Sequence, residues 1–446
     1  MPDSIPVRSI WTLITVDVFA RISYGLARTP VLPLYAACLG ASPEMIGFVG
    51  AAATLTGIAI KLPSGAISDV VGRRPLLVAG LAVFAIGPIL YLFVDRVWEL
   101  AGVRFFHGFA TALYGPVAMA AVAALAADRK GEYLSWLSNA KILGKLLGAF
   151  LGGLILSLAA GPLAASDTFR NLITGARPDA ALLDVSDFHL AYGICAFLGV
   201  LALGLGFLVL RDLGQREKAG GERRTFQQVW IRFRDGIRET ASDIRVLLAS
   251  GSEGVQNITV GVLEHFLPVY AVLIAGRTPL EAGLLWAGQM GTTILCKPMF
   301  GRHSDRRGRR GLIAFGMVIC ALPFAAVPWV TGFWPLMLLC LVFGLGEALV
   351  TSSSAAFVGD LCRSRSLGAA MGVFGTIKDS GHALGPILGG VLISLFAGTG
   401  AKAFGESGPV AFRATFVLVA AVVLAYAAVF FLVMQDKGIA DIEKQE

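Results

Sequence analysis

The feature that most limits how this chain can fold is a charged loop of ten residues that occurs twice in apolar sequence. The first copy runs from Gly65 to Arg74, and the second runs from Gly301 to Arg310, 236 residues later. Both copies carry Gly, Ser, Asp, Gly, Arg and Arg at the same places. Self-similarity at so long a period in an apolar chain indicates duplicated membrane architecture, as in secondary transporters.

Composition supports a membrane protein. Hydrophobic residues make up 56% of the 446 residues and charged residues only 15%, against roughly 25% charged residues in soluble domains. Windows of about 20 residues identify about twelve apolar spans. They lie near 10–37, 43–66, 74–94, 98–127, 133–160, 188–211, 246–275, 279–300, 311–331, 334–359, 366–397 and 410–435. Backbone groups in lipid must be satisfied within their own segment, so each span is predicted to be a helix.

A polar stretch at 212–243 divides the predicted helices into two groups. We therefore expect an N-terminal six-helix bundle at 1–211, a cytoplasmic linker at 212–243 and a C-terminal six-helix bundle at 244–446. Phe226 and Trp230 fall at helical spacing among arginines in the linker. This pattern predicts an amphipathic helix on the inner membrane surface, and a disordered linker is the alternative.

Lysine and arginine concentrate in alternate loops, including both copies of the repeated loop. The positive-inside rule therefore predicts an inner-membrane protein whose two termini and repeated loops are cytoplasmic. The net charge of +7 is explained by this signal, and nucleic-acid binding is not expected. The six cysteines are scattered, so neither a metal site nor a cofactor is expected. One chain holds both halves of the pore and is expected to work in the lipid bilayer as a monomer.

Several motifs resemble the major facilitator superfamily, and the resemblance covers essentially the whole chain. The repeated loop resembles the family's signature between helices 2 and 3, and Gly25–Tyr35 resembles the first-helix motif of drug:proton antiporters. Arg104–Gly108 resembles the fourth-helix motif, with His107 in place of the usual Gln. Gly381–Gly390 resembles the antiporter motif but falls in helix 11, while helix 5 has Ala149 in place of its Pro. The resemblance implies an all-α membrane protein, with twelve transmembrane helices in two pseudo-symmetric six-helix bundles.

The repeated loop is expected to act as a conformational gate, a role that rests on the resemblance. Its glycines allow close helix approach, its aspartates are placed at a helix N-terminus, and its arginines bond those aspartates. The gate residues are Gly65, Asp69, Arg73, Arg74, Gly301, Asp305, Arg309 and Arg310. The simpler alternative is that the arginines only determine topology.

Charged residues within the spans are costly in lipid and indicate a central cavity. Two sets repeat at the offset of 236 and each occupies one helical face: Asp17, Arg21 and Arg28 in span 1, and Glu253, Asn257 and Glu264 in span 7. We expect the two faces to meet across the cavity. Arg28 is then opposite Glu264, and Arg21 is near Glu253.

Spans 5 and 11 repeat a second layout at an offset of 237. A row of glycines in each lies about 100° around the helix from a row of basic residues. The glycines are Gly144, Gly148 and Gly152 in one span and Gly381, Gly385 and Gly389 in the other. The basic residues are Lys141, Lys145, Lys378 and His382. We expect the glycines to pack against a partner helix and the basic rows to face the pore.

The remaining candidates for substrate or proton binding are Arg104, His107, Glu347 and Asp379. Lys61 and Lys297 stand four residues before the repeated loops and are expected to snorkel to the interface. For His107, a hydrogen-bonded structural role is the alternative to a proton relay.

These residues predict proton-coupled export of a small organic solute, driven by the proton gradient. The proton would be carried by one of four buried acids, with Arg104 tuning one of them. The acids are Asp17, Glu253, Glu264 and Glu347. Because basic residues outnumber acids on the expected pore faces, an anionic solute, taken up or exported, is the alternative. No phosphate loop, metal spacing or catalytic cluster indicates an enzyme.

Overall fold

The computed structural model describes residues 4–126, 129–159, 183–217, 243–361, 367–397, 404–405 and 407–434. Regular structure in these ranges is helical throughout, as expected for a fully membrane-embedded chain. The N-terminal helices are α1 (Ser4–Leu26), α2 (Val31–Cys38), α3 (Pro43–Val71), α4 (Arg73–Tyr91), α5 (Val97–Leu125), α6 (Lys130–Ala159) and α8 (Val185–Glu217). The C-terminal helices are α10 (Ile244–Val269), α11 (Pro279–Arg307), α12 (Arg310–Ala326), α13 (Phe333–Leu361), α14 (Leu367–Ala397) and α15 (Gly408–Val433).

Each predicted span corresponds to a helix, and two of the spans are broken near prolines. Span 1 is divided between α1 and α2 by a turn that precedes Pro30, because proline cannot donate the backbone hydrogen bond that a helix needs. Span 7 passes from α10 into a π-helical turn, Tyr270–Ile274, just after Pro268. Span 6 was placed too short, since α8 continues to Glu217. Most of the predicted linker, 218–242, lies outside the described residues.

Eleven candidate membrane spans among the described residues are long and apolar enough to cross a membrane. The remaining long helix, α11, falls outside that group and carries polar residues such as Gln289 and Lys297 along its length. It packs against α6 and α13 inside the assembly. Together these helices form the expected all-α membrane fold, with twelve transmembrane helices in two pseudo-symmetric bundles.

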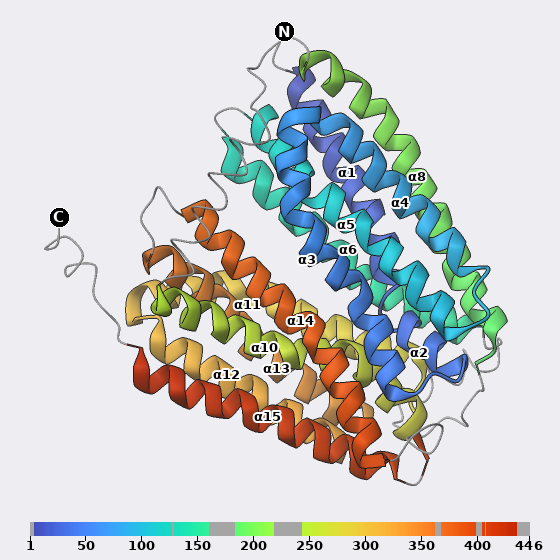
Figure 1. Ribbon diagram of the computed structural model, residues 1–446, viewed down its shortest axis with the longest axis vertical. Coiled ribbons are helices and arrows are strands. Elements are labelled where there is room, and N and C mark those ends of the chain that lie inside the picture. The colour runs from blue at the N-terminus through green and yellow to red at the C-terminus, as the bar shows by residue number, and fades with distance from the viewer. Residues whose placement is uncertain are drawn as a thin grey trace, which may run out of the picture.

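The two bundles lie side by side in Figure 1, with blue and green helices in one and yellow and red helices in the other. The seam between them is formed by two antiparallel pairs, α3 with α14 and α6 with α11. These four helices therefore carry any movement of one bundle relative to the other.

Glycine rows bring the helices of each bundle into close contact. Side chains added at Gly144 or Gly148 of α6 would collide with α1, and side chains added at Gly381 or Gly385 of α14 would collide with α10. Gly152 and Gly389 continue the two rows against Val31 and Phe266. The expected close approach is present in both halves, and it fixes how the basic rows of α6 and α14 are turned.

The seam is tight at one end, which we call the closed end. There Gly47 of α3 meets Pro386 of α14, and Gly153 of α6 meets the start of α11 at Pro279. Across the same contact, the backbone N–H of Leu280 donates to the Ser157 hydroxyl at 2.9 Å. No water layer fits between backbones that approach this closely.

At the opposite end, which carries the repeated loops, the seam is loose, and we call it the loop end. A methyl group added at Gly301 of α11 or at Gly372 or Gly375 of α14 would meet no atom of the described residues within 4 Å. The two bundles diverge toward this end in Figure 1. The molecule is therefore closed at one membrane face and open at the other.

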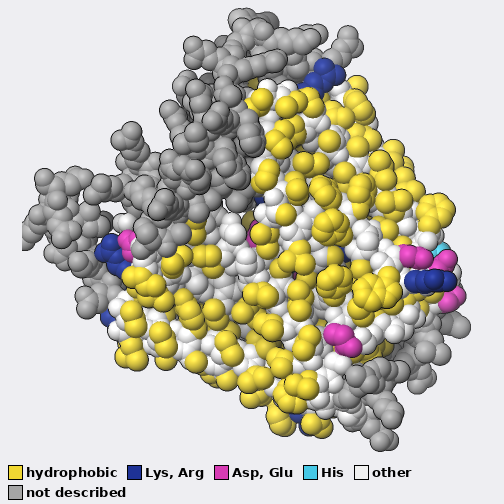
Figure 2. All heavy atoms as spheres, in the orientation of Figure 1, with side chains coloured by type: hydrophobic (Ala, Val, Ile, Leu, Met, Phe, Trp, Pro, Cys, Tyr) yellow, Lys and Arg dark blue, Asp and Glu magenta, His cyan; other side chains and the backbone are white. Residues whose placement is uncertain are grey.

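The surface is that of a multi-pass membrane protein. Figure 2 shows hydrophobic side chains over most of the visible face, and charged side chains near its edges. Large exposed apolar side chains such as Leu295, Leu395 and Leu432 point outward from three different helices. An exposed apolar surface of this extent matches a hydrocarbon environment rather than water.

The two repeated loops have the same backbone shape. Gly72 and Gly308 follow α3 and α11 with φ of 100° and 86°, in a region that glycine adopts without steric cost. The backbones of Asp69 and Asp305 lie in the last turns of α3 and α11. The expected placement of their carboxylates at a helix N-terminus stays a prediction. Their side chains, and Gly65, lie outside the described atoms.

The closed end yields a packing prediction. Gly47→Val inserts a branched side chain against the backbone of α14, so we expect the melting temperature of the purified protein to fall, because overpacking costs about 1–3 kcal/mol. The matched control is Gly102→Val on α5, where no atom lies within 4 Å. Equal melting temperatures for the two variants would contradict the tight seam.

Candidate functional site

A buried charge cluster joins the two bundles near the bend between α1 and α2. Arg28 from this bend forms an ion pair with Glu264 of α10, with Nη2 and Oε2 2.8 Å apart. His382 of α14 contacts the same oxygen at 3.0 Å, and the Thr29 hydroxyl donates to Oε1 at 3.2 Å. The predicted contact between Arg28 and Glu264 is therefore present. One carboxylate holds groups from both bundles.

A second ion pair crosses the seam nearer the loop end. Lys61 of α3 pairs with Asp379 of α14, beside a cavity of about 170 Å³ between the two helices. Gly57 and Met371 line the same cavity. The expectation that Lys61 snorkels to the interface is wrong, because an acid on the facing helix lies within reach of its ammonium group.

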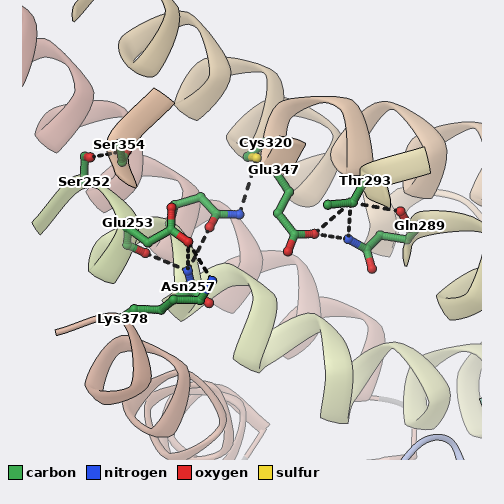
Figure 3. A network of polar contacts seen from close by, with 10 residues as sticks. Ser252, Glu253, Asn257, Gln289, Thr293, Cys320, Glu347, Ser354 and Lys378 are labelled. Atoms are coloured by element: carbon green, nitrogen blue, oxygen red, sulfur yellow. Dashed lines mark hydrogen bonds and ion pairs between the residues drawn. The ribbon is translucent and has the colours of Figure 1, made fainter. Parts of the chain in front are cut away.

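A polar network lies inside the C-terminal bundle and is drawn in Figure 3. The Lys378 ammonium group of α14 is 2.9 Å from the fully buried Glu253 carboxylate of α10. The Asn257 amide donates to the backbone carbonyl of Glu253 at 2.8 Å and to its carboxylate at 3.4 Å. Gln256 continues the network toward Cys320 of α12. Buried charge is thus compensated within one bundle.

Glu347 of α13 stands beside this network in Figure 3 and has neutral partners. It accepts hydrogen bonds from the Gln289 amide and, at 3.0 Å, from the Thr293 hydroxyl, both on α11. Lys378 and Lys297 are charged neighbours, but neither forms an ion pair with Glu347 in the described ranges. Glu347 therefore differs from the other interior acids, each of which contacts a cation.

The expected approach of Arg21 to Glu253 is wrong. Arg21 instead forms an ion pair with Asp17 at 3.2 Å on its own helix, and its guanidinium lies 5.8 Å from the Phe84 ring centroid. Glu253 forms its ion pair with Lys378 instead. A partner one turn away along α1 is always within reach, whereas a partner on α10 depends on how the bundles are placed.

Arg104 and His107 do not flank the cavity as expected. Both side chains are fully buried within the N-terminal bundle. The Arg104 guanidinium lies over the Tyr24 ring at 4.9 Å from its centroid, and the Tyr24 and His107 rings are 4.8 Å apart. No acidic partner of Arg104 is present among the described residues, so the predicted tuning of an acid is not supported. Its charge is accommodated by aromatic faces.

Lys141 and Lys145 lie on the seam side of α6. The charged neighbours of Lys141 include Arg21, and those of Lys145 include Arg28 and Glu264, so both lysines point toward the interior rather than toward lipid. Lys141 is exposed and Lys145 is half-buried. Neither forms a hydrogen bond or an ion pair with any part of the chain that the structure describes.

The arginines of the second loop contact their own bundle. Arg309 pairs with Asp360 at the end of α13 and donates to the Ser304 hydroxyl at 3.2 Å. Arg310 lies over the Phe431 ring of α15, 4.2 Å from its centroid. The expected bonding to the loop aspartate stays a prediction, because the Asp305 side chain lies outside the described atoms. The expected close packing at Gly301 is not found, because no atom of the described residues would lie within 4 Å of a side chain added there.

Sequence reasoning missed the uncharged members of the site. Thr29, Gln256, Gln289 and Thr293 complete the hydrogen bonding of the charged residues. A polar residue one turn from another on the same helix, as Gln289 is from Thr293, was an available signal. Amides and hydroxyls within membrane helices are common for other reasons, however, so this signal alone is weak.

An all-helical bundle with an apolar exterior and paired charges at a seam between two halves defines a membrane transporter rather than an enzyme. The chain belongs to the major facilitator superfamily, whose family model matches residues 18–277 and 258–445.

Curated relatives agree with this membership. The chain is 24% identical to an uncharacterized MFS-type transporter of Methanocaldococcus jannaschii, over 82% of this chain and 86% of the relative. It is 23% identical to the multidrug resistance protein MdtH of Yersinia enterocolitica, over 78% of this chain and 79% of the relative.

Among solved structures, a bacterial homologue of the human lysosomal transporter Spinster, inward-facing and unoccupied, matches with a TM-score of 0.74. The match covers 96% of each chain at 14% identity, and it shows the fold alone.

The two partners of the Lys378–Glu253 ion pair differ in exposure, so replacing one should cost more stability than replacing the other. The Glu253 side chain is 0% exposed and the Lys378 side chain is 33% exposed. Lys378→Met strands a buried carboxylate, so we expect it to lower the melting temperature more than Glu253→Gln, which leaves an ammonium group that water reaches. Removing one partner of a buried pair costs about 3–5 kcal/mol.

The double variant, Glu253→Gln with Lys378→Met, is the control for this pair. It should recover much of the loss, because neither charge is left unpaired. Equal effects of the single variants, or additive losses in the double variant, would contradict the pairing.

Proposed function

We propose that this protein exports small organic solutes in exchange for protons across the inner membrane, with the loop end in the cytoplasm. Membership of the major facilitator superfamily and a relative named as a multidrug resistance protein support export of this kind. The concentration of arginine and lysine in the loops at one end supports the orientation. The same signal supports cytoplasmic termini, and one chain containing both bundles supports function as a monomer.

The observation that carries the proposal is the position of Glu264. Its carboxylate is held by Arg28 and Thr29 at the α1–α2 bend and by His382 of its own bundle. An ionised Glu264 therefore ties the bundles together close to their seam. A protonated Glu264 has no charge with which to attract Arg28, so protonation weakens the tie.

An exchange cycle follows from this contact. With the closed end shut and the loop end open, Glu264 is ionised and paired, and a solute can enter the cavity from the cytoplasm. With the closed end open, Glu264 is accessible from outside and takes up a proton while the solute leaves. Return to the first state releases the proton inward. Rocking of the two bundles about the seam supplies the alternating access.

We expect Glu264→Gln to abolish proton-driven flux while leaving solute exchange at equal pH. The variant is reconstituted in proteoliposomes, and flux of a cationic dye (ethidium), a quinolone (norfloxacin) and an anionic dye (carboxyfluorescein) is followed with and without a pH gradient. The wild type should move at least one of these solutes against its gradient, and a protonophore should stop this movement. In the variant the proton gradient no longer supplies energy, so the accumulation ratio of the solute should fall about tenfold for every 1.4 kcal/mol that the gradient supplies to the wild type.

Lys297→Gln is the matched control, because Lys297 is an interior lysine without an ion pair in the described ranges. It should keep its pH-driven flux. Wild-type flux that ignores the pH gradient for all three solutes would contradict proton coupling.

A further inference from the structure

The charges inside this protein divide into those with partners and those without. Five acids of the interior have at least one polar contact with this chain, namely Asp17, Glu253, Glu264, Glu347 and Asp379. The cations that serve four of them are Arg21, Lys378, Arg28 and Lys61. Every predicted acid of the cavity is therefore already occupied by groups of this chain.

Among the predicted basic residues, Arg104 and His107 lie against aromatic rings, and Lys141 and Lys145 of α6 have neither a ring contact nor a hydrogen bond nor an ion pair in the described ranges. A third interior lysine, Lys297, also has no ion pair in the described ranges, and its charged neighbours are one cation, Lys378, and two carboxylates, Glu347 and Glu253. The positive charge of Lys297 is therefore partly offset by two carboxylates of its own bundle. Each lysine of α6 has an acidic neighbour, Asp17 or Glu264, that already pairs with an arginine.

The surroundings of Lys141 are dominated by positive charge. Among the described residues, the charged neighbours that act most strongly on Lys141 are three cations, Arg21, Lys145 and Lys61, and one acid, Asp17, which already pairs with Arg21. Lys145 has Arg28 and Arg21 as neighbours, and its acidic neighbour Glu264 is bound by Arg28 and His382. Cations that repel one another at close range are stabilised when an anion binds between them.

The helix geometry places the two ammonium groups for joint binding. Residues four apart lie on the same helical face, with Cβ atoms about 5–6 Å apart. The glycine row of α6, beginning at Gly144, is pressed against α1 and turns the lysine row toward the seam. Lys141 is exposed and Lys145 is half-buried, so neither side chain is sealed in the core.

We propose that Lys141 and Lys145 form a binding site for an acidic group of the transported solute, such as a carboxylate, phosphate or sulfonate. This site would bind the solute during the proposed export cycle, and the direction in which the solute moves rests on that proposed function. Two ammonium groups one turn apart can each donate to a different oxygen of the same anion. The site narrows the solute class from small organic molecules to organic acids and zwitterions that carry an acidic group.

The first test measures the sign of the electrical potential at the lysines without any transported solute. The native cysteines are first replaced, and Ser138→Cys then supplies one thiol on the exposed surface of α6, seven residues and about two turns before Lys145. This thiol is treated with two methanethiosulfonates, the negatively charged sulfonatoethyl reagent and the positively charged trimethylammonioethyl reagent. The rate of each reaction is divided by the rate at which the same reagent modifies free cysteine. We expect the negative reagent to react faster.

Replacing both lysines by glutamine should lower the rate ratio, negative over positive reagent, on the order of tenfold, since the local potential amounts to a few kT. Replacing both by arginine should preserve it. Lys297→Gln should leave it unchanged. A parallel protein that keeps only the native Cys38, an exposed thiol at the closed end with Asp184 and Asp187 as neighbours, should show no effect of the lysines.

The second test asks whether an acid binds. Benzoate, phenyl phosphate and benzenesulfonate are compared with neutral benzamide and cationic benzamidine as protectants of Ser138→Cys against modification. At least one of the three acids should slow the reaction in the protein with both lysines and not in the double glutamine variant. The neutral and cationic compounds should not protect.

A rate ratio that does not depend on the lysines would overturn the proposal. Protection by benzamidine equal to that by the acids, or no protection by any acid, would also overturn it. These outcomes are separate from the proton-coupling test. A lysine-dependent acid site in a protein whose flux ignores the pH gradient would leave the site standing and remove the proposed coupling.

Discussion

The cost of charge inside an apolar bundle is the constraint on which the rest of this structure depends. An ionised side chain facing lipid is expensive, so every charged residue of the spans must find a partner, an aromatic face or a water-filled space. The three solutions occur together here. Arg28 forms an ion pair with Glu264, the Arg104 guanidinium lies over the Tyr24 ring, and Lys141 is exposed at the seam.

The position of each partner decides what an ion pair can do. Asp17 with Arg21, and Glu253 with Lys378, lie within a single bundle and hold its helices in register whatever the other bundle does. Arg28 with Glu264 crosses between bundles and must break when the bundles separate. Glycine rows that bind α6 to α1 and α14 to α10 keep each bundle rigid, so separation is concentrated at the seam.

Much of the fold could be predicted because hydropathy and duplication leave strong signals in sequence. The twelve spans were located to within a few residues, and the offset of 236 identified Arg28 and Glu264 as related positions before any contact was known. The partner of Arg21 was missed because an i, i+4 pair on one helix competes with any partner across the seam.

The remaining errors share one physical origin, the relative placement of helices. The pairing of Lys61 with Asp379 depends on how far α3 slides along α14, and no local pattern specifies that distance. Arg104 belongs to a segment that resembles a family motif. Its contact with the Tyr24 ring depends on how the helices are rotated about their axes, which cannot be read from the sequence. Gly301 repeats Gly65 in sequence, yet no helix of the described part of the chain packs closely against it.

The most direct test of the account is a distance measured across the closed end. Spin labels at Phe93 and Val410, exposed positions at this end of the two bundles, report the separation by double electron–electron resonance. A second pair, Phe93 and Leu190, lies within one bundle and is the control. If Glu264 ties the bundles together, Glu264→Gln should shift the first distance distribution to longer values and leave the second unchanged. Identical distributions for the wild type and the variant across the pH range would contradict the account.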